Sequence, residues 1–242
     1  MKMLAELMHL FSKTVAALQP HYFPSVMDAV RGALAPVILF ADHLQVPRQS
    51  RVTRVVFPVS PRPFRLVVPI HYHRKQSIAQ TRVDYHHNWQ RQHQEALRHF
   101  FHHMPYFDGF YWDVATVLQN PPQYLGDLLG KIWQATHQRL FPAKPWYRTA
   151  HFQLWTPAAI RDWLKQKGIS TFLVTPEEVP YYQAMFPHHP LIVVELPQIV
   201  AEFDGMAISP QHPLLMGLWF KGPAFLKHCI EQAQFRRLRT LK

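Results

Sequence analysis

Short apolar runs alternate with a helical pattern along the first part of the chain. Residues 15–18 (V-A-A-L) and 37–40 (V-I-L-F) are continuous apolar runs with the length of buried strands. Residues 25–34 between them have helical spacing, and Ser25 stands where it can cap the first turn. A strand, a helix and a strand so close together predict a right-handed parallel unit. A further strand is expected at residues 64–70.

Two longer helical patterns follow in the middle of the chain. Residues 88–104 carry an apolar stripe that Pro105 ends, and the stripe consists of Trp89, Ala96, Leu97, Phe100 and Met104. His93 lies in the centre of this stripe, so it is either a core histidine with a hydrogen-bond partner or a side chain that faces a cavity. Another helix is expected at residues 125–140.

The second half of the chain repeats the alternation. A helix is expected from Thr156 and Pro157 to Gly168, in the order of cap, proline and terminal glycine. Continuous apolar strands are expected at residues 170–174 and 191–196, and a last helix at 223–237. The pattern predicts an α/β protein with a mostly parallel sheet flanked by helices, including an α/β C-terminal part.

The expected organisation is one compact unit in two parts. Residues 1–14 read as an amphipathic lead rather than a cleaved signal, because charged residues interrupt the apolar positions. Residues 15–143 form an N-terminal α/β part that carries the candidate site, and 144–242 form the C-terminal α/β part. The link A-K-P-W-Y at residues 143–147 marks the boundary.

Composition limits the partners. The chain has 242 residues, and its 26 Lys+Arg against 15 Asp+Glu give a formal charge of +11. This surplus favours an anionic partner, such as a phosphorylated small molecule (a nucleotide-sugar) or an acyl carrier. Nucleic acid is not the expected partner, because no recognised nucleic-acid module is present. No apolar stretch reaches the ~20 residues of a membrane span, and one cysteine fits the reducing cytoplasm.

Polar side chains follow the first two predicted strands. Gln19, His21 and Tyr22 come after residues 15–18, while Asp42 and Gln45 come after residues 37–40. Ligands of open α/β sheets bind outside the carboxyl ends of strands, so these groups are expected to converge on one crevice. There Asp42 would orient or deprotonate an imidazole, either His21 or its own neighbour in sequence, His43. The alternative is a purely structural role, in which Gln19 and Asp42 cap the turns and the aromatic rings pack together as a small core.

Several of these segments together resemble the WbqC-like protein family. The stretches that carry the resemblance are Q-P-H-Y-F-P at 19–24, F-A-D-H-L-Q at 40–45, Arg54, L-V-V-P-I at 66–70, Trp89 with His93, M-P-Y-F at 104–107, K-G-I-S-T at 167–171 and L-W-F-K-G-P at 218–223. Each motif alone has low specificity, but they occur in the family's order over roughly residues 15–232.

The resemblance implies a role in bacterial surface-polysaccharide (O-antigen) synthesis. An acyl or aminoacyl group, such as glycine, would be transferred to a nucleotide-sugar or another sugar intermediate. The expected catalytic residues are His21, Asp42 and His93. The expected substrate-binding residues are Gln19, Tyr22, Gln45, Arg54 and Trp89, with Arg54 on a phosphate.

Two other classes of function remain open. One is a nucleotide-dependent activating or nucleotidyl-transfer enzyme, although the stretch H-Y-F-P lacks the H-x-G-H signature. The other is a non-catalytic basic protein that binds nucleic acid or an acidic partner. It is favoured by the charge and by departures from the family pattern, in which His43, Thr53, Met216 and Lys221 replace polar or acidic residues.

The remaining candidate groups have structural interpretations beside the functional ones. The arginines at 48–65 form either a phosphate grip or a solvated face. His99 and His103 are one helical turn apart, but no metal-ligand motif accompanies them, so no metal site is expected. Cys229 is expected to be a buried thiol of the core. No glycine-rich nucleotide motif is present, and the sequence does not identify a cofactor.

Overall fold

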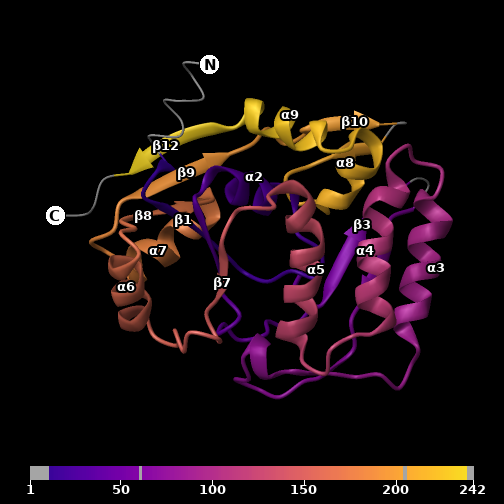
Figure 1. Cartoon of the computed structure of the whole chain (residues 1–242), viewed down its shortest axis with the longest axis horizontal. Coiled ribbons are helices and arrows are strands. Elements are labelled where there is room, and N and C mark those ends of the chain that lie inside the picture. The colour runs from indigo at the N-terminus through magenta and orange to yellow at the C-terminus, as the bar shows by residue number, and fades with distance from the viewer. Residues whose placement is uncertain (1–10, 60–61, 204–205, 239–242) are drawn as a thin grey trace.

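A six-stranded sheet forms the centre of the molecule. The structure is a computed structural model that describes residues 11–59, 62–203 and 206–238. The sheet has the order β12-β9-β8-β1-β2-β7 (Figure 1), and its strands are Thr14–Leu18 (β1), Val37–Phe40 (β2), Trp146–Arg148 (β7), Thr171–Val174 (β8), Leu191–Glu195 (β9) and Gln234–Leu238 (β12). All neighbouring strands are parallel except β12 and β9. The predicted α/β class with a mostly parallel sheet is confirmed.

Both faces of the inner strands β9, β8, β1 and β2 are buried, and alternate residues of each strand face opposite sides. In β1, Val15 and Ala17 pack with helices α6 (Pro157–Gln166) and α7 (Val179–Met185). Ala16 and Leu18 belong to the larger core on the other face. That core is covered by α2 (Val26–Leu34), α5 (Leu125–Leu140), α8 (Leu214–Lys221) and α9 (Ala224–Gln232). Burial on both faces explains why these strands are apolar throughout.

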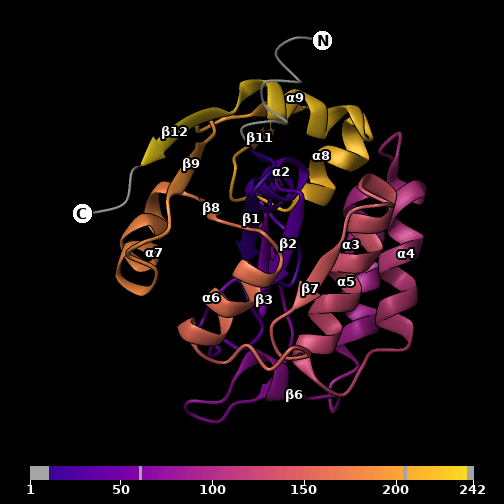
Figure 2. The same ribbon diagram turned by 60° about the vertical axis from the view of Figure 1, so that its left-hand side comes forward.

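Three helices stand together beside the sheet. They are α3 (Trp89–Phe101), α4 (Phe107–Gln119) and α5. Figure 2 shows them on one side of the sheet, with α6 and α7 on the other. The chain reaches them from β2 through two antiparallel hairpins. These pair β3 (Arg54–Phe57) with β4 (Phe64–Val67) and β5 (Ile70–His71) with β6 (Arg82–Val83), with a 3₁₀ turn at Ile78–Gln80 before β6. A third hairpin pairs β10 (Ala201–Phe203) with β11 (Met206–Ile208), and a second 3₁₀ turn, Pro176–Glu178, precedes α7.

Several expected elements occur where the sequence places them. Strands β1, β2, β8 and β9 and helices α2, α3, α5 and α6 match the predicted ranges to within a few residues. Ser25 caps α2, and its hydroxyl accepts from the Asp28 amide at 3.1 Å. An amphipathic lead is expected at residues 1–14. Residues 1–10 of this segment lie outside the described residues, and Thr14 is the first residue of β1.

The single strand expected at residues 64–70 is wrong. The structure has two short strands there, β4 and β5, and both belong to hairpins outside the main sheet. Pro69 interrupts the pattern because it has no N–H group for a ladder hydrogen bond. Residue 67 pairs with Arg54, and the chain turns into the next hairpin after Pro69.

The last helix expected at residues 223–237 is also wrong in its second half. Helix α9 ends at Gln232, and Gln234–Leu238 forms β12, antiparallel to β9. The strand covers what would otherwise be an open edge of Leu191–Glu195, and this pairing overrides local helical propensity. Residues 146–148 of the expected link form β7, hydrogen-bonded to β2.

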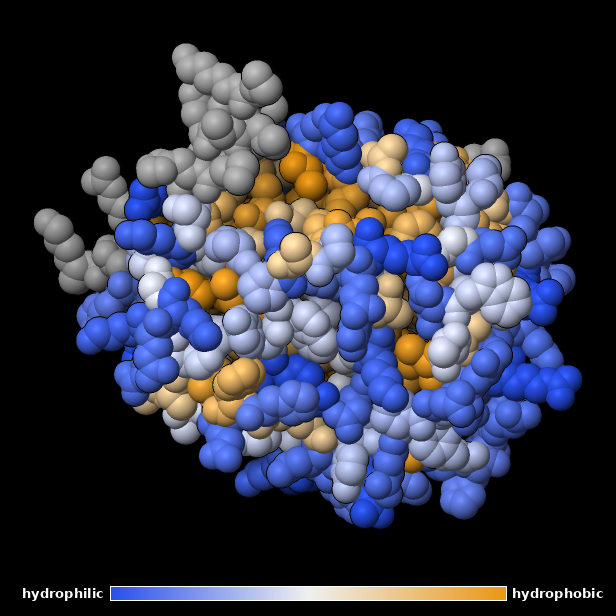
Figure 3. Space-filling view, in the orientation of Figure 1, coloured by the Kyte–Doolittle hydropathy of each residue, from blue (hydrophilic) through white to orange (hydrophobic). Residues whose placement is uncertain are grey.

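Helices α4, α7 and α8 were not expected from the sequence. In α8 the run L-L-M-G-L-W-F is apolar all round, and such a helix lacks an amphipathic period because it is buried on every side. On the face shown in Figure 3, polar residues dominate the lower half and an apolar band crosses the region of α2. None of the helices within the described residues combines the length and the apolar character that crossing a bilayer requires.

Candidate active site

The turn after β1 holds a histidine against a buried carboxylate. His21 Nδ1 lies 2.9 Å from Asp28 Oδ2, and the Ser25 hydroxyl donates to the same oxygen at 2.7 Å. Burial alone would raise the pKa of Asp28, yet the charge and hydrogen bond of His21, together with Arg51 and Arg31, hold it well below its usual range. The His21 side chain is 13% exposed, and none of the described residues hydrogen-bonds its Nε2. The turn therefore presents one free imidazole nitrogen in a fixed orientation.

Tyr22 points the opposite way, into the core. Its hydroxyl is 2.8 Å from His93 Nδ1, and Trp89 packs against both rings. Tyr22 is completely buried and His93 is 5% exposed. Burial lowers the pKa of His93 to about 4, and a hydrogen bond to the Val67 backbone opposes this only in part. A neutral imidazole that donates to Val67 from one nitrogen and accepts from Tyr22 at the other satisfies every contact.

This neutral histidine makes the fold sensitive to acid. Its pKa of about 4 lies below the ordinary value of 6.5, so the unfolded chain binds more protons between these values. As far as His93 is concerned, the free energy of unfolding is therefore at its full value above about pH 6.5 and falls as the pH drops toward 4. We expect the free energy of unfolding to fall by ~2 kcal/mol from this residue alone between pH 7 and pH 5.

Urea unfolding of wild type and His93→Asn across this pH range checks the expectation. Asn keeps an acceptor near Tyr22 but does not titrate, so its profile should be flatter. His137, whose pKa burial and then Lys144 lower to about 4, supplies a residual slope in both proteins. Equal slopes for the two proteins would contradict this account of His93.

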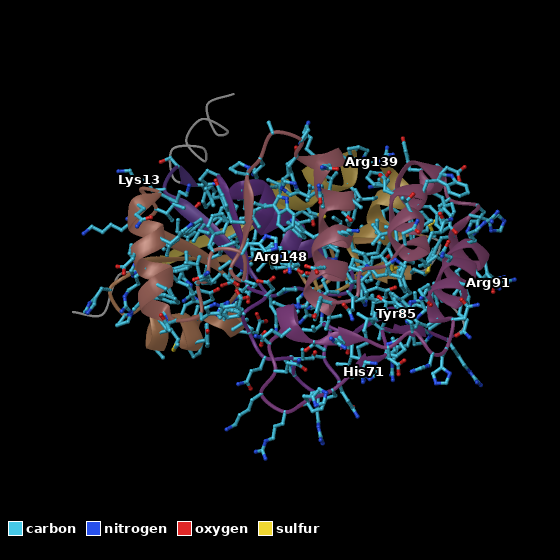
Figure 4. All side chains as sticks on the ribbon, turned by 60° about the horizontal axis from the view of Figure 1, so that its bottom comes forward. Lys13, His71, Tyr85, Arg91, Arg139 and Arg148 are labelled. Atoms are coloured by element: carbon cyan, nitrogen blue, oxygen red, sulfur yellow. The ribbon has the colours of Figure 1, made fainter. Side chains whose placement is uncertain are left out.

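Asp42 is engaged elsewhere, at the ends of β2 and β7. It is fully buried; Arg148 donates to its Oδ2 at 2.7 Å, and Thr149 and the Ala150 amide both donate to Oδ1 at 2.9 Å. Arg148 lies between the sheet and α5 (Figure 4), where it also donates to Asp127 at 2.6 Å. The structure thus does not bring Asp42 into contact with His21. Parallel pairing of β2 with β7 gives Asp42 partners that come a hundred residues later in the chain.

The other predicted residues lie in different surroundings. Gln19 is half-buried directly after β1, and no hydrogen bond of its side chain occurs among the described residues. Gln45 is exposed and forms a backbone bridge with Ser77. His43 hydrogen-bonds the Thr149 hydroxyl at 2.9 Å, and burial lowers its pKa despite the charge of Asp42. Gln45 and His43 therefore do not join the turn at residues 19–25.

Arg54 lines a cavity of about 170 Å³ on the outer side of the β3–β4 hairpin. We call it the cationic cavity, and its lining residues are Phe23, Gln49, Arg51, Arg54, Val55, Val56, Gln211, His212 and Pro213. Arg54 Nε is buried and has no hydrogen-bond partner among the described residues. Arg51 donates to Gln211 Oε1. Burial, and then the charge of Arg51, lowers the pKa of His212, so two guanidinium groups carry the positive charge here.

Backbone hydrogen bonds fix the walls of the cationic cavity relative to the His21 turn. The Tyr22 amide donates to the Arg51 carbonyl at 3.0 Å, and the Val26 amide donates to the His212 carbonyl at 3.1 Å. On the other side of the turn, Leu214 donates to the Pro24 carbonyl at 2.9 Å. Three segments distant in sequence are thus joined around residues 19–26.

Sequence reasoning missed Asp28, Gln211 and His212. Asp28 had a local signal, because an acidic residue three positions after a serine cap is a capping box. Gln211 and His212 had none: they lie 160 residues from Arg51, in a turn without a motif.

Two groups noted in the sequence lie apart from the cavity. Cys229 is fully buried, and burial raises its pKa to about 12, which keeps the thiol protonated. His99 and His103 are exposed on and just after α3. Among the described residues, no group of three or more His, Cys, Asp or Glu side chains is arranged to hold a metal ion.

Comparison with known proteins identifies the relationship at the level of a family. No curated protein and no solved structure matches the chain. The sequence profile described as the WbqC-like protein family matches residues 19–188, which include the His21 turn, the arginines of the cationic cavity and strands β2, β7 and β8 of the sheet. The chain therefore belongs to the WbqC-like protein family.

Proposed function

We propose that this protein is a transferase that moves an acyl or aminoacyl group, such as glycine, to a nucleotide-sugar or another sugar intermediate of bacterial surface-polysaccharide synthesis. The observation that carries the proposal is the His21–Asp28 pair, which presents a free imidazole nitrogen on a turn whose backbone is hydrogen-bonded to Arg51 and His212 in the walls of the cationic cavity. It lies just after β1, at the carboxyl end of a parallel strand, where α/β proteins bind ligands. Family membership supports the substrate class.

In this proposal His21 is the general base. A hydroxyl or amino group of the sugar attacks the carbonyl carbon of an activated acyl group, such as a thioester. His21 Nε2 accepts the proton of the attacking group, and the bond from the carbonyl carbon to sulfur breaks. The imidazolium then returns its proton to the leaving thiolate. Asp28 holds the ring through Nδ1 and stabilises its charged form, as the third group of a catalytic triad does.

The other predicted residues have supporting roles. Gln19 contributes an amide to the substrate from the same turn. Tyr22, Trp89 and His93 hold the inner side of the turn, and Asp42 positions the carboxyl ends of β2 and β7. The reaction is proposed to occur in the cytoplasm, where nucleotide-sugars and thioesters are available.

The test is turnover by a His21→Asn variant. Nucleotide-sugars with free amino or hydroxyl groups are incubated with acyl and glycyl thioesters, and products are detected by mass. We expect the variant to lose about 10²-fold in kcat, because a positioned proton acceptor contributes at least that much. His73→Asn, which removes an exposed histidine of the β5–β6 loop, should retain wild-type kcat. Equal turnover by wild type and His21→Asn would remove His21 from the mechanism.

A second candidate is suggested by exposed charge on the hairpin region. Arg48, Arg74 and Lys75 are all exposed, and the loop after His71 projects from the body with nitrogen-tipped side chains (Figure 4). Asp84 is the single acidic residue between positions 43 and 94. This surface favours binding of an acidic partner or nucleic acid without catalysis. Retention on DNA or RNA that falls steeply with salt on a log–log plot would support it over the transferase.

A further inference from the structure

We infer that the cationic cavity is a phosphate-binding site that takes the phosphate monoester group of a polyhydroxylated ligand. Arg54 and Arg51 are its principal ligands, and the side chain of Gln211 separates it from the space for the rest of the ligand. The inference deepens the proposed function and rests on it only for the choice of a sugar as the organic part.

The position of Arg54 is set by the alternation of β3. Val55 and Phe57 are buried, whereas Arg54 and Val56 are on the outer side of the hairpin; both of these residues line the cavity, together with Val55. Arg54 Nε is nevertheless buried without a hydrogen-bond partner. A buried donor without a hydrogen-bond acceptor destabilises the folded protein, so it needs an explanation. No hydrogen bond of the other guanidinium nitrogens of Arg54 occurs among the described residues either, and a ligand oxygen in the cavity would supply an acceptor for this group.

The positive charge of the cavity is not neutralised by ion pairs. Among the described residues, neither Arg51 nor Arg54 forms a salt bridge with a carboxylate. The Asp28 carboxylate, which acts electrostatically on Arg51, is already held by His21 and Ser25. Two guanidinium groups beside one small cavity are suited to the bidentate hydrogen bonds that phosphate oxygens accept.

The turn that carries Arg51 has an unusual backbone. Gln49, which also lines the cavity, has a φ of 52°, in the left-handed region that non-glycine residues rarely adopt. Such conformations persist where surrounding contacts impose them, and they are frequent at ligand sites. The hydrogen bond from the Tyr22 amide to the Arg51 carbonyl is one such contact.

Gln211 lines two cavities at once. Beyond it lies a second cavity of about 320 Å³, whose lining includes Met27, Glu195, Gln198 and Ser209. The remaining walls of the cationic cavity include the apolar side chains of Phe23, Val55, Val56 and Pro213. A phosphate ester would therefore extend its organic part past Gln211, where carboxylate, amide and hydroxyl groups can hydrogen-bond sugar hydroxyls. In doing so it would release Arg51 from Gln211.

Calorimetric titration with inorganic phosphate tests the phosphate site directly. We expect saturable binding by wild type, at least about ten-fold weaker binding by Arg54→Ala, and partial recovery in Arg54→Lys, which restores charge without the planar fork. Arg82→Ala is the matched control: it removes an exposed arginine of the neighbouring hairpin and should bind within two-fold of wild type. Acetate and sulfate titrations establish whether the site prefers phosphate. Absence of binding, or equal loss in Arg54→Ala and Arg82→Ala, would overturn the inference.

A second arm tests the extension past Gln211. Glucose 1-phosphate should bind several-fold more tightly than inorganic phosphate, and Glu195→Gln should reduce this advantage without altering the affinity for inorganic phosphate. Equal affinities in wild type would overturn the extended part alone. His21→Asn should bind phosphate as wild type does, so loss of turnover tests the transferase and loss of binding tests this site. Thermal unfolding of each variant confirms that it is folded.

Discussion

Replacing Asp42 with alanine is expected to lower the free energy of unfolding by about 3–5 kcal/mol. The carboxylate is fully buried and accepts from Arg148, Thr149 and the Ala150 amide. Without it, the Arg148 guanidinium stays in the interior with Asp127 as its remaining carboxylate. The loss is large because this buried charge keeps only the partly exposed Asp127 as a carboxylate partner, and the Thr149 hydroxyl and the Ala150 amide lose their acceptor. Urea unfolding followed by circular dichroism measures it.

Asp127→Ala is the matched control for this prediction. Asp127 pairs with the same Arg148 but its side chain is 42% exposed, so water replaces it, and its loss should amount to about 1 kcal/mol or less. A loss below 1 kcal/mol for Asp42→Ala would show that the network is dispensable. A stable Asp42→Ala variant without turnover would instead assign Asp42 a direct role in catalysis.

Replacing Gly217 with alanine is expected to destabilise the protein by roughly 3 kcal/mol or more, the upper range for overpacking a core. A Cβ atom at this position in α8 would lie 2.1 Å from the ring of Phe225 in α9. The ring is completely buried and cannot move aside without displacing its neighbours. Thermal or urea unfolding of the purified variant measures the effect; recovery only as insoluble protein would agree with it.

Gly109 in α4 provides the opposite case. A Cβ atom there meets nothing within 4 Å, so Gly109→Ala should stabilise the protein by about 0.5–1 kcal/mol through helical propensity. Similar stabilities for the two alanine variants would mean that α8 and α9 do not pack as described.

The elements that could be predicted are those whose local pattern and tertiary surroundings agree. The buried strands β1, β2, β8 and β9 are apolar because both faces of the sheet are covered, and α2 has a capping box at its start. Residues 234–238 form a strand only because β9 offers an edge 40 residues earlier in the chain. Such long-range pairing leaves no local signal, and the same is true of β7 beside β2.

The candidate site was predictable only in part for a similar reason. His21 and Arg54 stand in segments whose composition already suggested binding, and the turn after β1 is well placed by topology alone. Their neighbours could not be inferred, because Gln211 and His212 lie in a segment, residues 210–214, that backbone hydrogen bonds hold against residues 24–27. The direction of Tyr22 toward His93 depends on the packing of α3, which sequence spacing does not determine.

The order of strands in the sheet has a consequence for synthesis of the chain on the ribosome. Val15 pairs with Val37 on one side but with Phe172 on the other, and Ile38 pairs with Trp146, which is synthesised more than a hundred residues later. A nascent chain that has emerged only as far as residue 143 holds two strands of the six, with both of their outer edges open. Unpaired strand edges can pair with other chains, and the pairings of β1 with β8 and of β2 with β7 form slowly because long stretches of chain separate the partners. We therefore expect the growing polypeptide to need chaperone protection until β8 is available.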